Sequence, residues 1–315
     1  MTDFTLRQLE HFTAIVEEGS IALAAARLRV SAAGLSLSLS QLEQSLDVQL
    51  TIRQRGKGVA ITPAGRWVYD EARTVLGRAA GIQQAAQAVR GELTGTLRVG
   101  CFPTLSPWLF PRIAAHFSEA YPGVQLDLAE NTSGALQEML KNGDLDSALL
   151  YRNHLQRGIE GVDVVAVRLQ LALSPAHPLA SRESVHLSEL EDEDAILLDM
   201  QPSMGHVEDL LRSAGIMRKV RWRSTNAETI RSMVARGLGY SIIMGRPFGD
   251  HTYDGLPIRY TRIADEVPPN AVVVAFPDGT MPTAKIRALI AFCRREFGRE
   301  GEPSFPAGLS GTGPI

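Results

Sequence analysis

Cysteine and long apolar runs are scarce in this 315-residue sequence, and their scarcity excludes several classes of protein. The two cysteines, Cys101 and Cys293, lie far apart, so they form neither a zinc-ligand spacing nor a disulfide framework. No stretch reaches the roughly 18 apolar residues of a membrane span, and residues 1–9 lack the apolar core of a signal peptide. We therefore expect a cytoplasmic protein that has no membrane partner.

Motifs of catalysis and of cofactor binding are also missing. The sequence contains no nucleophile elbow, phosphate loop, dinucleotide fingerprint or metalloprotease motif. None of the seven histidines falls in a metal motif, and His206 alone draws attention, because it lies one turn into a predicted helix beside Ser203. These absences predict a protein that is not an enzyme and that binds neither a cofactor nor a metal.

Charge is distributed unevenly along the chain, although the net charge is only −3. Between Arg27 and Arg66 there are six basic and two acidic residues, whereas residues 91–315 hold 22 basic and 27 acidic residues. A basic N-terminal segment on an acidic remainder is typical of a small module that faces phosphates.

Residue types divide the chain into four parts. Residues 1–62 are helix-rich and residues 63–91 form one long predicted helix. Residues 92–297 alternate strands and helices, which indicates an α/β domain. The tail, residues 298–315, is rich in Gly, Pro and Ser and is predicted to be disordered.

The first part has the pattern of a helix-turn-helix. A helix over about residues 5–18 ends at Gly19, Ser20 caps a second helix over residues 21–28, and Ser31 caps a third. The third helix repeats leucine at spacings of four, three and four, and these leucines define its core face: Leu35, Leu39, Leu42 and Leu46. Two short helices, a tight turn and a capped second helix are typical of this DNA-binding motif.

The opposite face of the third helix is either a DNA-reading surface or a solvated one. If the helix enters a major groove, five side chains meet the bases: Ala33, Leu37, Ser40, Gln41 and Gln44. The neighbouring candidates for DNA contact are Arg27, Arg29, Ser31, Gly34 and Ser36. Residues 48–62 then predict a β-hairpin, and its cations Arg53, Arg55 and Lys57 would let it act as a wing that grips phosphates or the minor groove.

The long helix begins at Thr62, as its N-cap, followed by Pro63. Its apolar residues recur at alternating spacings of four and three, an unbroken heptad seam: Val68, Ala72, Val75, Ala79, Ile82, Ala86 and Val89. Such a seam needs a partner, so we interpret it as a homodimer interface. The alternative is that the seam packs on the C-terminal domain of the same chain.

Taken together, these residues resemble the LysR-type transcriptional regulators. The resemblance begins with Leu6-Arg7-Gln8-Leu9-Glu10-His11-Phe12 and continues through residues 18–20, 24–28, 30–31, 35–36, 42–43, 50, 53 and 62–65. It extends downstream through residues 97–100, 121–124, 143–146 and 234–239, and so covers the chain to about residue 297. The resemblance implies double-stranded DNA and RNA polymerase as partners, a small-molecule effector, and a homotetramer built from two kinds of dimer.

The third helix departs from the family pattern. The family usually carries Gln-Pro and a basic residue where this chain has Ala32-Ala33 and Leu37, and a phenylalanine where it has Thr51. The third helix therefore has no Lys or Arg, and we predict a shallow dependence of DNA affinity on salt. Leu37 would be able to contact a thymine methyl group. The alternative is that DNA binding is simply weak.

Four times in the α/β region, a strand is followed by a small polar residue at the start of a helix. Helix N-termini at the carboxyl ends of strands bind anions, and one pair of these helices in each half suggests two lobes with a cleft between them. The candidates that would hold an effector are Phe102, Thr104, Ser133, Tyr151, Arg152, Ser203, Met204 and Asn226. Plain helix capping is the alternative for each polar residue alone, and Cys101 beside this cleft is better explained as a buried structural cysteine than as a redox sensor.

The fold class expected is an N-terminal all-α winged helix-turn-helix with a long linker helix, followed by a two-lobed α/β effector domain, which resembles periplasmic binding proteins. The function expected is DNA-binding transcription regulation controlled by a small effector that bears a carboxylate. The alternative is a solute-binding or enzymatic α/β protein without DNA regulation. A solute-binding protein would not carry the helix-turn-helix, and an enzyme would need a catalytic constellation that the sequence lacks.

Overall fold

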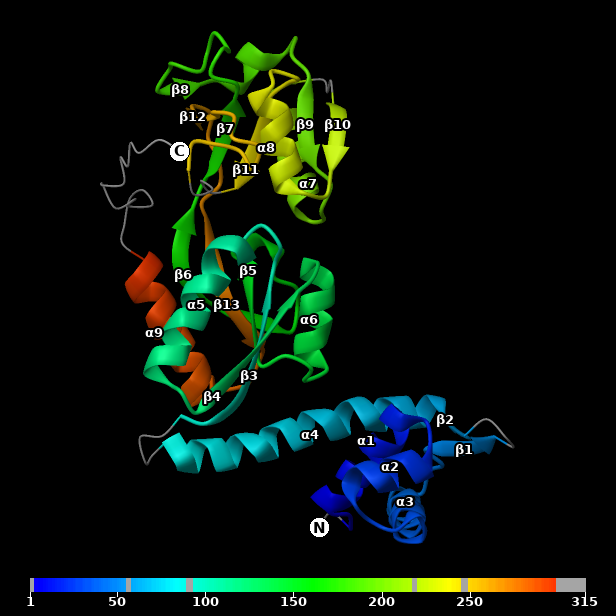
Figure 1. The fold of residues 1–315 in the computed structure, drawn as a ribbon. Coiled ribbons are helices and arrows are strands. Elements are labelled where there is room, and N and C mark those ends of the chain that lie inside the picture. Colours follow the sequence, from blue (N-terminus) through cyan, green and yellow to red (C-terminus); the bar gives the residue numbers. More distant parts are fainter. Residues whose placement is uncertain (1–2, 55–57, 89–92, 217–219, 245–248, 299–315) are drawn as a thin grey trace. The chain divides into compact units, whose positions relative to one another are not determined.

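The computed structural model describes residues 3–54, 58–88, 93–216, 220–244 and 249–298 (Figure 1). The described chain divides into two compact units. One comprises Met1–Thr94 with Lys141–Asp144, and the second begins at Gly95 and holds the rest. The predicted disordered tail beyond residue 298 and the wing residues Arg55 and Lys57 lie outside the described residues.

Three short helices form the core of the first unit, as the sequence predicts. They are α1 (Leu6–Glu18), α2 (Ile21–Leu28) and α3 (Ala32–Leu46). Each begins at a residue whose side chain accepts a hydrogen bond from a backbone N–H of the first turn: Thr5, Ser20 and Ser31. Gly19 ends α1 in the left-handed conformation. Leu35, Leu39 and Leu42 are buried with Phe12 and Ile15, so the core face predicted for α3 is confirmed.

A two-stranded antiparallel hairpin of β1 (Thr51–Gln54) and β2 (Gly58–Ile61) follows α3. The Glu43 carboxylate accepts hydrogen bonds from the backbone N–H groups of Leu50 and Thr51 at 2.8 and 3.0 Å, and so ties α3 to the start of the hairpin. The Val59 N–H donates to the Gly19 carbonyl at 2.8 Å. These contacts attach the predicted wing to the helices at both of its strands.

The long helix α4 (Pro63–Ala88) begins where the sequence places it, with the Thr62 hydroxyl accepting from the Gly65 N–H at 2.8 Å. Its predicted seam divides into two parts. Ala72 is 2% exposed and packs with Val68 on the core of the first unit. Val75 and Ile82 are 40% and 72% exposed. The side chains of Ala86 and Val89 lie outside the described residues. The first two seam positions therefore stabilise their own unit, which neither interpretation of the seam anticipated.

The first lobe of the second unit is built on the sheet β4-β3-β5-β13-β6. Its strands are β3 (Gly95–Cys101), β4 (Val124–Glu130), β5 (Ser147–Tyr151), β6 (Ile159–Val167) and β13 (Asn270–Pro277). The helices of this lobe are α5 (Ser106–Ala120), α6 (Ser133–Lys141) and α9 (Ala284–Phe297), with the short 3-10 helix η1 (Arg152–His154) after β5. All five residues of β5 are buried, which places the segment after it against the core of the lobe.

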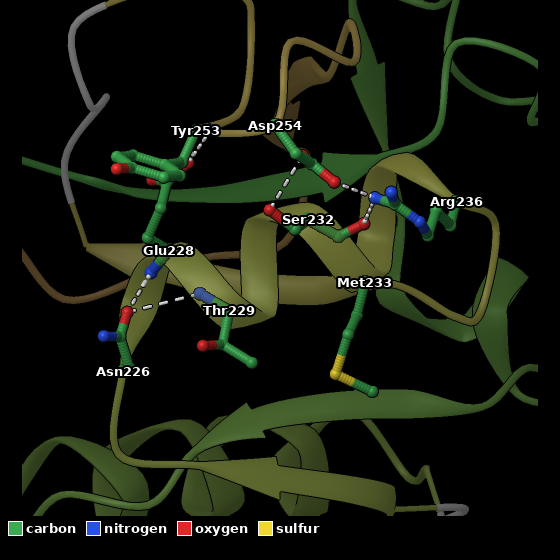
Figure 2. Close-up of a pocket in the computed structure, with 8 residues that line it drawn as sticks. All are labelled: Asn226, Glu228, Thr229, Ser232, Met233, Arg236, Tyr253 and Asp254. Atoms are coloured by element: carbon green, nitrogen blue, oxygen red, sulfur yellow. Dashed lines mark hydrogen bonds and ion pairs between the residues drawn. The ribbon is translucent and has the colours of Figure 1, made fainter.

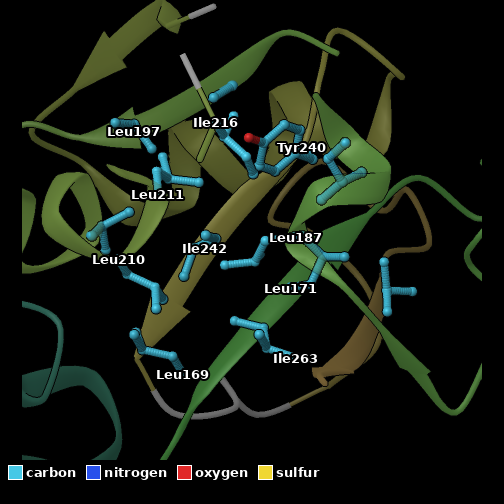
Figure 3. Close-up of a cluster of buried hydrophobic side chains, with 14 of the residues drawn as sticks. Leu169, Leu171, Leu187, Leu197, Leu210, Leu211, Ile216, Tyr240, Ile242 and Ile263 are labelled. Carbon is cyan, nitrogen blue, oxygen red and sulfur yellow. The ribbon is translucent and has the colours of Figure 1, made fainter. Parts of the chain in front are cut away.

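The second lobe contains the sheet β11-β7-β12-β8 and the parallel pair β10-β9. Its strands are β7 (Leu169–Leu173), β8 (Ser184–Val185), β9 (Ala195–Leu198), β10 (Val220–Ser224), β11 (Ser241–Met244) and β12 (Arg259–Ile263), with the short 3-10 helix η2 (Leu187–Leu190). Its two long helices are α7 (Ser203–Ser213) and α8 (Ala227–Ala235). Leu171, Leu187, Leu211, Tyr240 and Ile242 pack together in its core (Figure 3).

Two crossings join the lobes, at β6–β7 and at β12–β13 (Figure 1). The second crossing returns the chain to the first sheet, where β13 lies between β5 and β6 and pairs antiparallel with both. The C-terminal helix α9 therefore completes the first lobe, which combines two segments that are distant in sequence, whereas the second lobe is one continuous stretch from β7 to β12.

Candidate functional site

A group of side chains at the junction of the two lobes centres on His154, in η1. We call Phe102, Thr104, Tyr151, His154, Ser203 and His206 the inter-lobe cluster. The Ser203 hydroxyl at the start of α7 lies 3.1 Å from His154 Nε2. Asn153 Nδ2 lies 2.9 Å from His206 Nδ1, one turn further along α7. Two hydrogen bonds thus connect η1 of the first lobe to the N-terminus of α7 in the second.

Aromatic rings enclose His154 on the side of the first lobe. The ring centroids of Phe102 and Tyr151 lie 5.0 and 5.1 Å from that of His154, in edge-on contacts. The His206 ring lies 6.0 Å away and is stacked. Tyr151 OH lies 3.0 Å from Thr104 Oγ1. The cluster therefore offers hydroxyl and imidazole groups within an otherwise apolar, aromatic surround.

Gln137, on α6, holds the segment from His154 to Gln156 in place. Its Nε2 donates to the His154 carbonyl at 3.0 Å and to Ser133 Oγ at 3.2 Å, and its Oε1 accepts from the Gln156 N–H at 2.7 Å. Gln137 and Ser133 are both buried. Ser133 is one of the predicted effector residues. Because its hydroxyl is buried and accepts from Gln137, it supports the cluster indirectly, through Gln137.

Burial governs the protonation of this cluster. Desolvation, with a smaller contribution from repulsion by His206, lowers the pKa of His154 from 6.5 to about 3. Desolvation also raises the pKa of the Tyr151 phenol well above its usual value. Both rings are therefore neutral near pH 7. Nδ1 of His154 is buried without a hydrogen-bond partner among the described residues, an arrangement that costs free energy.

The structure brings together five of the eight predicted effector residues and separates three. Phe102, Thr104, Tyr151 and Ser203 belong to the cluster and Ser133 adjoins it. The Arg152 guanidinium instead pairs with Asp163 and donates to the Gly161 carbonyl on β6. The other two, Met204 and Asn226, contact Arg223 and the first turn of α8. Sequence reasoning missed His154; its only signal was a polar segment directly after a fully buried strand.

The helix N-termini differ in how they are satisfied. Asn226 Oδ1 accepts from the Glu228 and Thr229 N–H groups and so caps α8. Thr132 Oγ1 accepts from the Ala135 N–H near the start of α6. At α5 and α7 no side chain among the described residues acts as an N-cap. Plain capping thus explains Asn226, whereas the two helices that start at the cluster present N-termini without side-chain caps.

A separate, open pocket of about 520 Å³ lies on α8 in the second lobe (Figure 2). Its charged groups are already engaged, since Asp254 binds Arg236 and Ser232, and the Glu228 carboxylate accepts from the Tyr253 N–H. Tyr253 is 93% exposed at its edge. Because its charges are paired within the protein, this pocket is a weaker candidate for the effector-binding site than the inter-lobe cluster.

Neither cysteine is accessible to solvent. Cys101 and Cys293 are both fully buried. Desolvation raises the pKa of Cys101 well above the usual value and that of Cys293 to about 12. Both thiols are therefore protonated near pH 7, and the thiolate that reacts with oxidants is scarce.

The face of α3 opposite its leucine core is exposed. All five side chains that the sequence pattern places on this face are exposed: Ala33, Leu37, Ser40, Gln41 and Gln44. Leu37 is 61% exposed. Of the neighbouring candidates, Ser31 caps α3, Gly34 and Arg29 are exposed, and Ser36 is half-buried. The side chain of Arg53 lies outside the described residues.

Arg27 is engaged within its own unit. Its guanidinium lies 2.7 Å from Glu17 and 3.0 Å from Glu18, at the end of α1. Hydrogen bonding to these carboxylates raises the pKa of Arg27, which stays charged. Two carboxylates at such short range offset its attraction for a phosphate.

Comparison with known proteins identifies the class. The family model described as "Bacterial regulatory helix-turn-helix protein, lysR family" matches residues 6–66, and that of the "LysR substrate binding domain" matches residues 90–298. The chain belongs to the LysR family of transcription regulators. It is accordingly a DNA-binding regulator with an effector-binding domain, and not an enzyme.

Individual relatives cover most of the chain. The chain is 28% identical to the "Uncharacterized HTH-type transcriptional regulator YvbU" of Bacillus subtilis over 94% of its own length and 100% of that protein. It is 30% identical to the "DNA-binding transcriptional dual regulator OxyR" of Escherichia coli over 76% and 78% of the two chains. Among solved structures, Pseudomonas aeruginosa HinK matches with a TM-score of 0.62 at 31% identity over 93% of this chain and 99% of that chain. A full-length OxyR variant from the same organism matches with a TM-score of 0.73 at 27% identity over 93% and 98%.

No single helix within the described residues is long and apolar enough to cross a membrane. Helices α2 and α3 are long and apolar enough only when they are taken together, and a bend of 108° separates them.

Proposed function

We propose that this regulator is controlled by a small molecule that bears a carboxylate and binds at the inter-lobe cluster. The observation that carries the proposal is the hydrogen bond between Ser203 and His154, because it brings the start of α7 against the first lobe. The Nδ1 atom of His154 is buried there and has no hydrogen-bond partner among the described residues. A ligand seated here contacts both lobes at once. It gives His154 Nδ1 a partner, and so relieves the cost of leaving that atom unpaired.

The preference for a carboxylate rests on the two helices that start at the cluster. Within the described residues neither α5 nor α7 has a side-chain cap, and the positive end of each helix dipole favours an anion. At α5 the Ser106 and Trp108 N–H groups already donate to the Phe102 and Leu105 carbonyls, so its contribution comes from the dipole.

The Ser203 and Thr104 hydroxyls donate hydrogen bonds to the same anion. His154 stays neutral. When Ser203 donates to the anion, its oxygen accepts from His154 Nε2–H, so Nδ1 accepts from a donor group of the effector other than the carboxylate.

The proposed mechanism is a shift between two arrangements of the lobes. An effector that contacts η1 and α7 together stabilises the arrangement in which they are close, by its differential affinity for the two states. Along the chain, the described lobes are linked at the β6–β7 and β12–β13 crossings, so a change in the contacts at the cluster rotates one lobe on the other. In an oligomer this movement changes the spacing of the DNA-binding units and their contact with RNA polymerase.

Regulators of this family form oligomers, and we propose a homodimer through α4 that assembles into a homotetramer. Trp67, Val75 and Ile82 support it, because they are 78%, 40% and 72% exposed along one side of the helix.

The proposal divides the chain into a DNA-binding domain (1–62), a linker helix (63–91), an effector domain (92–297) and a tail (298–315). A cytoplasmic location belongs to the same proposal.

Peroxide sensing is the second function to weigh, because several relatives at about 30% identity are named hydrogen peroxide-inducible genes activators. Oxidation by peroxide requires an accessible thiolate. The sequence has only Cys101 and Cys293, and both are buried with a raised pKa. This observation favours a bound organic effector over thiol oxidation.

A thermal-shift screen of organic acids against the full-length protein tests the proposal. A true effector raises the unfolding temperature in proportion to the logarithm of its concentration above Kd. The double variant Thr104→Ala/Ser203→Ala should lose the shift, and Ser232→Ala, at the α8 pocket, should retain it. Both variants should bind DNA without effector as the wild type does. A shift that survives in Thr104→Ala/Ser203→Ala but disappears in Ser232→Ala would place the effector in the α8 pocket and contradict the proposal.

A further inference from the structure

The outer face of α3 combines small residues with one large apolar side chain. Ala32, Ala33 and Gly34 form the first turn and are all exposed. Leu37 follows Ala33 by one turn, on the same face, and is 61% exposed. Side chains this small let the first turn of the helix approach a surface closely. Leu37 is then the side chain that extends furthest from that part of the helix.

No charged side chain of α3 lies beside Leu37. The helix contains no Lys or Arg, and its one acidic residue, Glu43, accepts hydrogen bonds from the Leu50 and Thr51 backbone. The polar members of the exposed face are Ser40, Gln41 and Gln44, which lie one turn or more beyond Leu37. Gln41 is also within 3.5 Å of Gln8 on α1. The described unit thus presents an isolated leucine where a DNA-reading helix would meet the base edges.

We infer that Leu37 determines the DNA sequence preference of this regulator by packing on thymine 5-methyl groups in the major groove. The inference rests on the DNA-reading role of the exposed α3 face. It specifies the base: T·A pairs are selected at the position opposite Leu37.

The chemistry of base edges leads to thymine. A leucine has neither a donor nor an acceptor, so any base pair opposite it loses hydrogen bonds to water without replacement, and only an apolar contact can offset that loss. Thymine is the base that presents an apolar group in the major groove. Burying one methyl against a leucine corresponds to roughly a fourfold gain in affinity.

The test removes the methyl group and nothing else. Full-length protein first selects duplexes from a random double-stranded pool, and each thymine of a selected duplex is then replaced singly by deoxyuridine, which keeps the base pairing. We expect deoxyuridine to weaken binding about fourfold at the position opposite Leu37. Replacing that pair by 5-methylcytosine·G should bind more tightly than unmethylated C·G, because it restores the methyl.

Two variants assign the effect to one side chain. In Leu37→Ala the thymine duplex should bind about as weakly as the deoxyuridine duplex, and deoxyuridine should have no further effect. Gln44→Ala, on the same helix face, should weaken binding yet leave the deoxyuridine effect intact. Thermal unfolding checks that both variants fold.

Each failure has a different meaning. The inference is overturned if deoxyuridine changes the binding affinity at no position, or if it weakens binding equally in the wild type and in Leu37→Ala. Sequence-specific DNA binding would remain intact in both cases. If the wild type enriches no sequence from the pool, the DNA-reading role assigned to the α3 face is itself wrong, and the inference falls with it.

Discussion

The Ser203 hydroxyl lies 3.1 Å from Nε2 of His154, and the two residues are 49 positions apart in the sequence. This hydrogen bond joins the N-terminus of α7 in the second lobe to η1 in the first. The imidazole is 3% exposed, so its partner and its protonation state both depend on how the lobes meet. Acidification should therefore act on the stability of the second unit.

Protonation of His154 should destabilise the folded protein below about pH 6. Burial lowers its pKa from 6.5 to about 3, so the unfolded chain binds the proton more tightly in this range. Stability from this group is therefore complete above pH 6.5 and is lost as pH falls toward 3, by about 2 kcal/mol between pH 7.5 and pH 5. Urea unfolding at both pH values should show this loss in the wild type and a smaller one in His154→Gln, which removes the titrating group. An equal loss in the two proteins would contradict the low pKa of His154.

Two glycines of α4 should respond to alanine in opposite directions. A Cβ at Gly65 would overlap the Leu50 carbonyl oxygen, whereas a Cβ at Gly77 would meet nothing within 4 Å. Gly65→Ala should lower the free energy of unfolding by roughly 2–4 kcal/mol through steric overlap. Gly77→Ala should raise it by about 0.5–1 kcal/mol, because alanine favours the helix. Calorimetry of the two variants checks the pair, and effects of the same sign would show that the α4–hairpin contact is misplaced.

Charges placed on the exposed part of the α4 seam should dissociate the proposed dimer. Val75→Asp/Ile82→Asp puts two carboxylates on a surface that the partner helix would cover, and buried unpaired charge is costly. Sedimentation velocity at micromolar concentration should show a smaller assembly than the wild type. Gly77→Asp is the matched control, since its side chain lies about 200° around the helix from Val75. An unchanged mass in the double variant would mean that the chains associate elsewhere.

DNA affinity should depend on salt less steeply than for a regulator with a basic reading helix. Helix α3 contributes no cation, and Arg27 is held by Glu17 and Glu18. Each phosphate contact adds about 0.9 to the slope of log K against log salt. Glu17→Gln/Glu18→Gln should release Arg27 and steepen that slope by about one unit, measured by fluorescence anisotropy from low to moderate salt. A wild-type slope that corresponds to about ten contacts would refute the expectation.

Local patterns in the sequence account for the first unit and for much of the second. The leucine spacing of α3 predicted its buried face, and Ser20, Ser31 and Thr62 predicted the starts of three helices. These features succeed because they depend on contacts three or four residues apart, within a single helix. Local patterns also predicted the winged helix-turn-helix and the two-lobed α/β fold, whereas the family was predicted from the resemblance of many motifs in order.

The effector site could be predicted only in part. Ser203 and Thr104 were identifiable as small polar residues at helix starts, but the same signal selected Asn226, which caps its own helix. His154 had no motif to identify it. Its role arises because a fully buried strand ends beside Phe102 and because α7 approaches from the other lobe. Nor could the heptad spacing show that Val68 and Ala72 pack on their own unit.

By itself, the sequence determined where helices begin and end, which faces of them are apolar, and to which family the chain belongs. The tertiary structure decided which polar residues meet. It joined Ser203 to His154, turned Arg152 toward Asp163, buried both cysteines and left Leu37 exposed. The physical reason is that capping and periodicity involve free energies local to a few residues. Contacts between segments dozens of residues apart depend instead on how whole elements pack, and no short pattern records that.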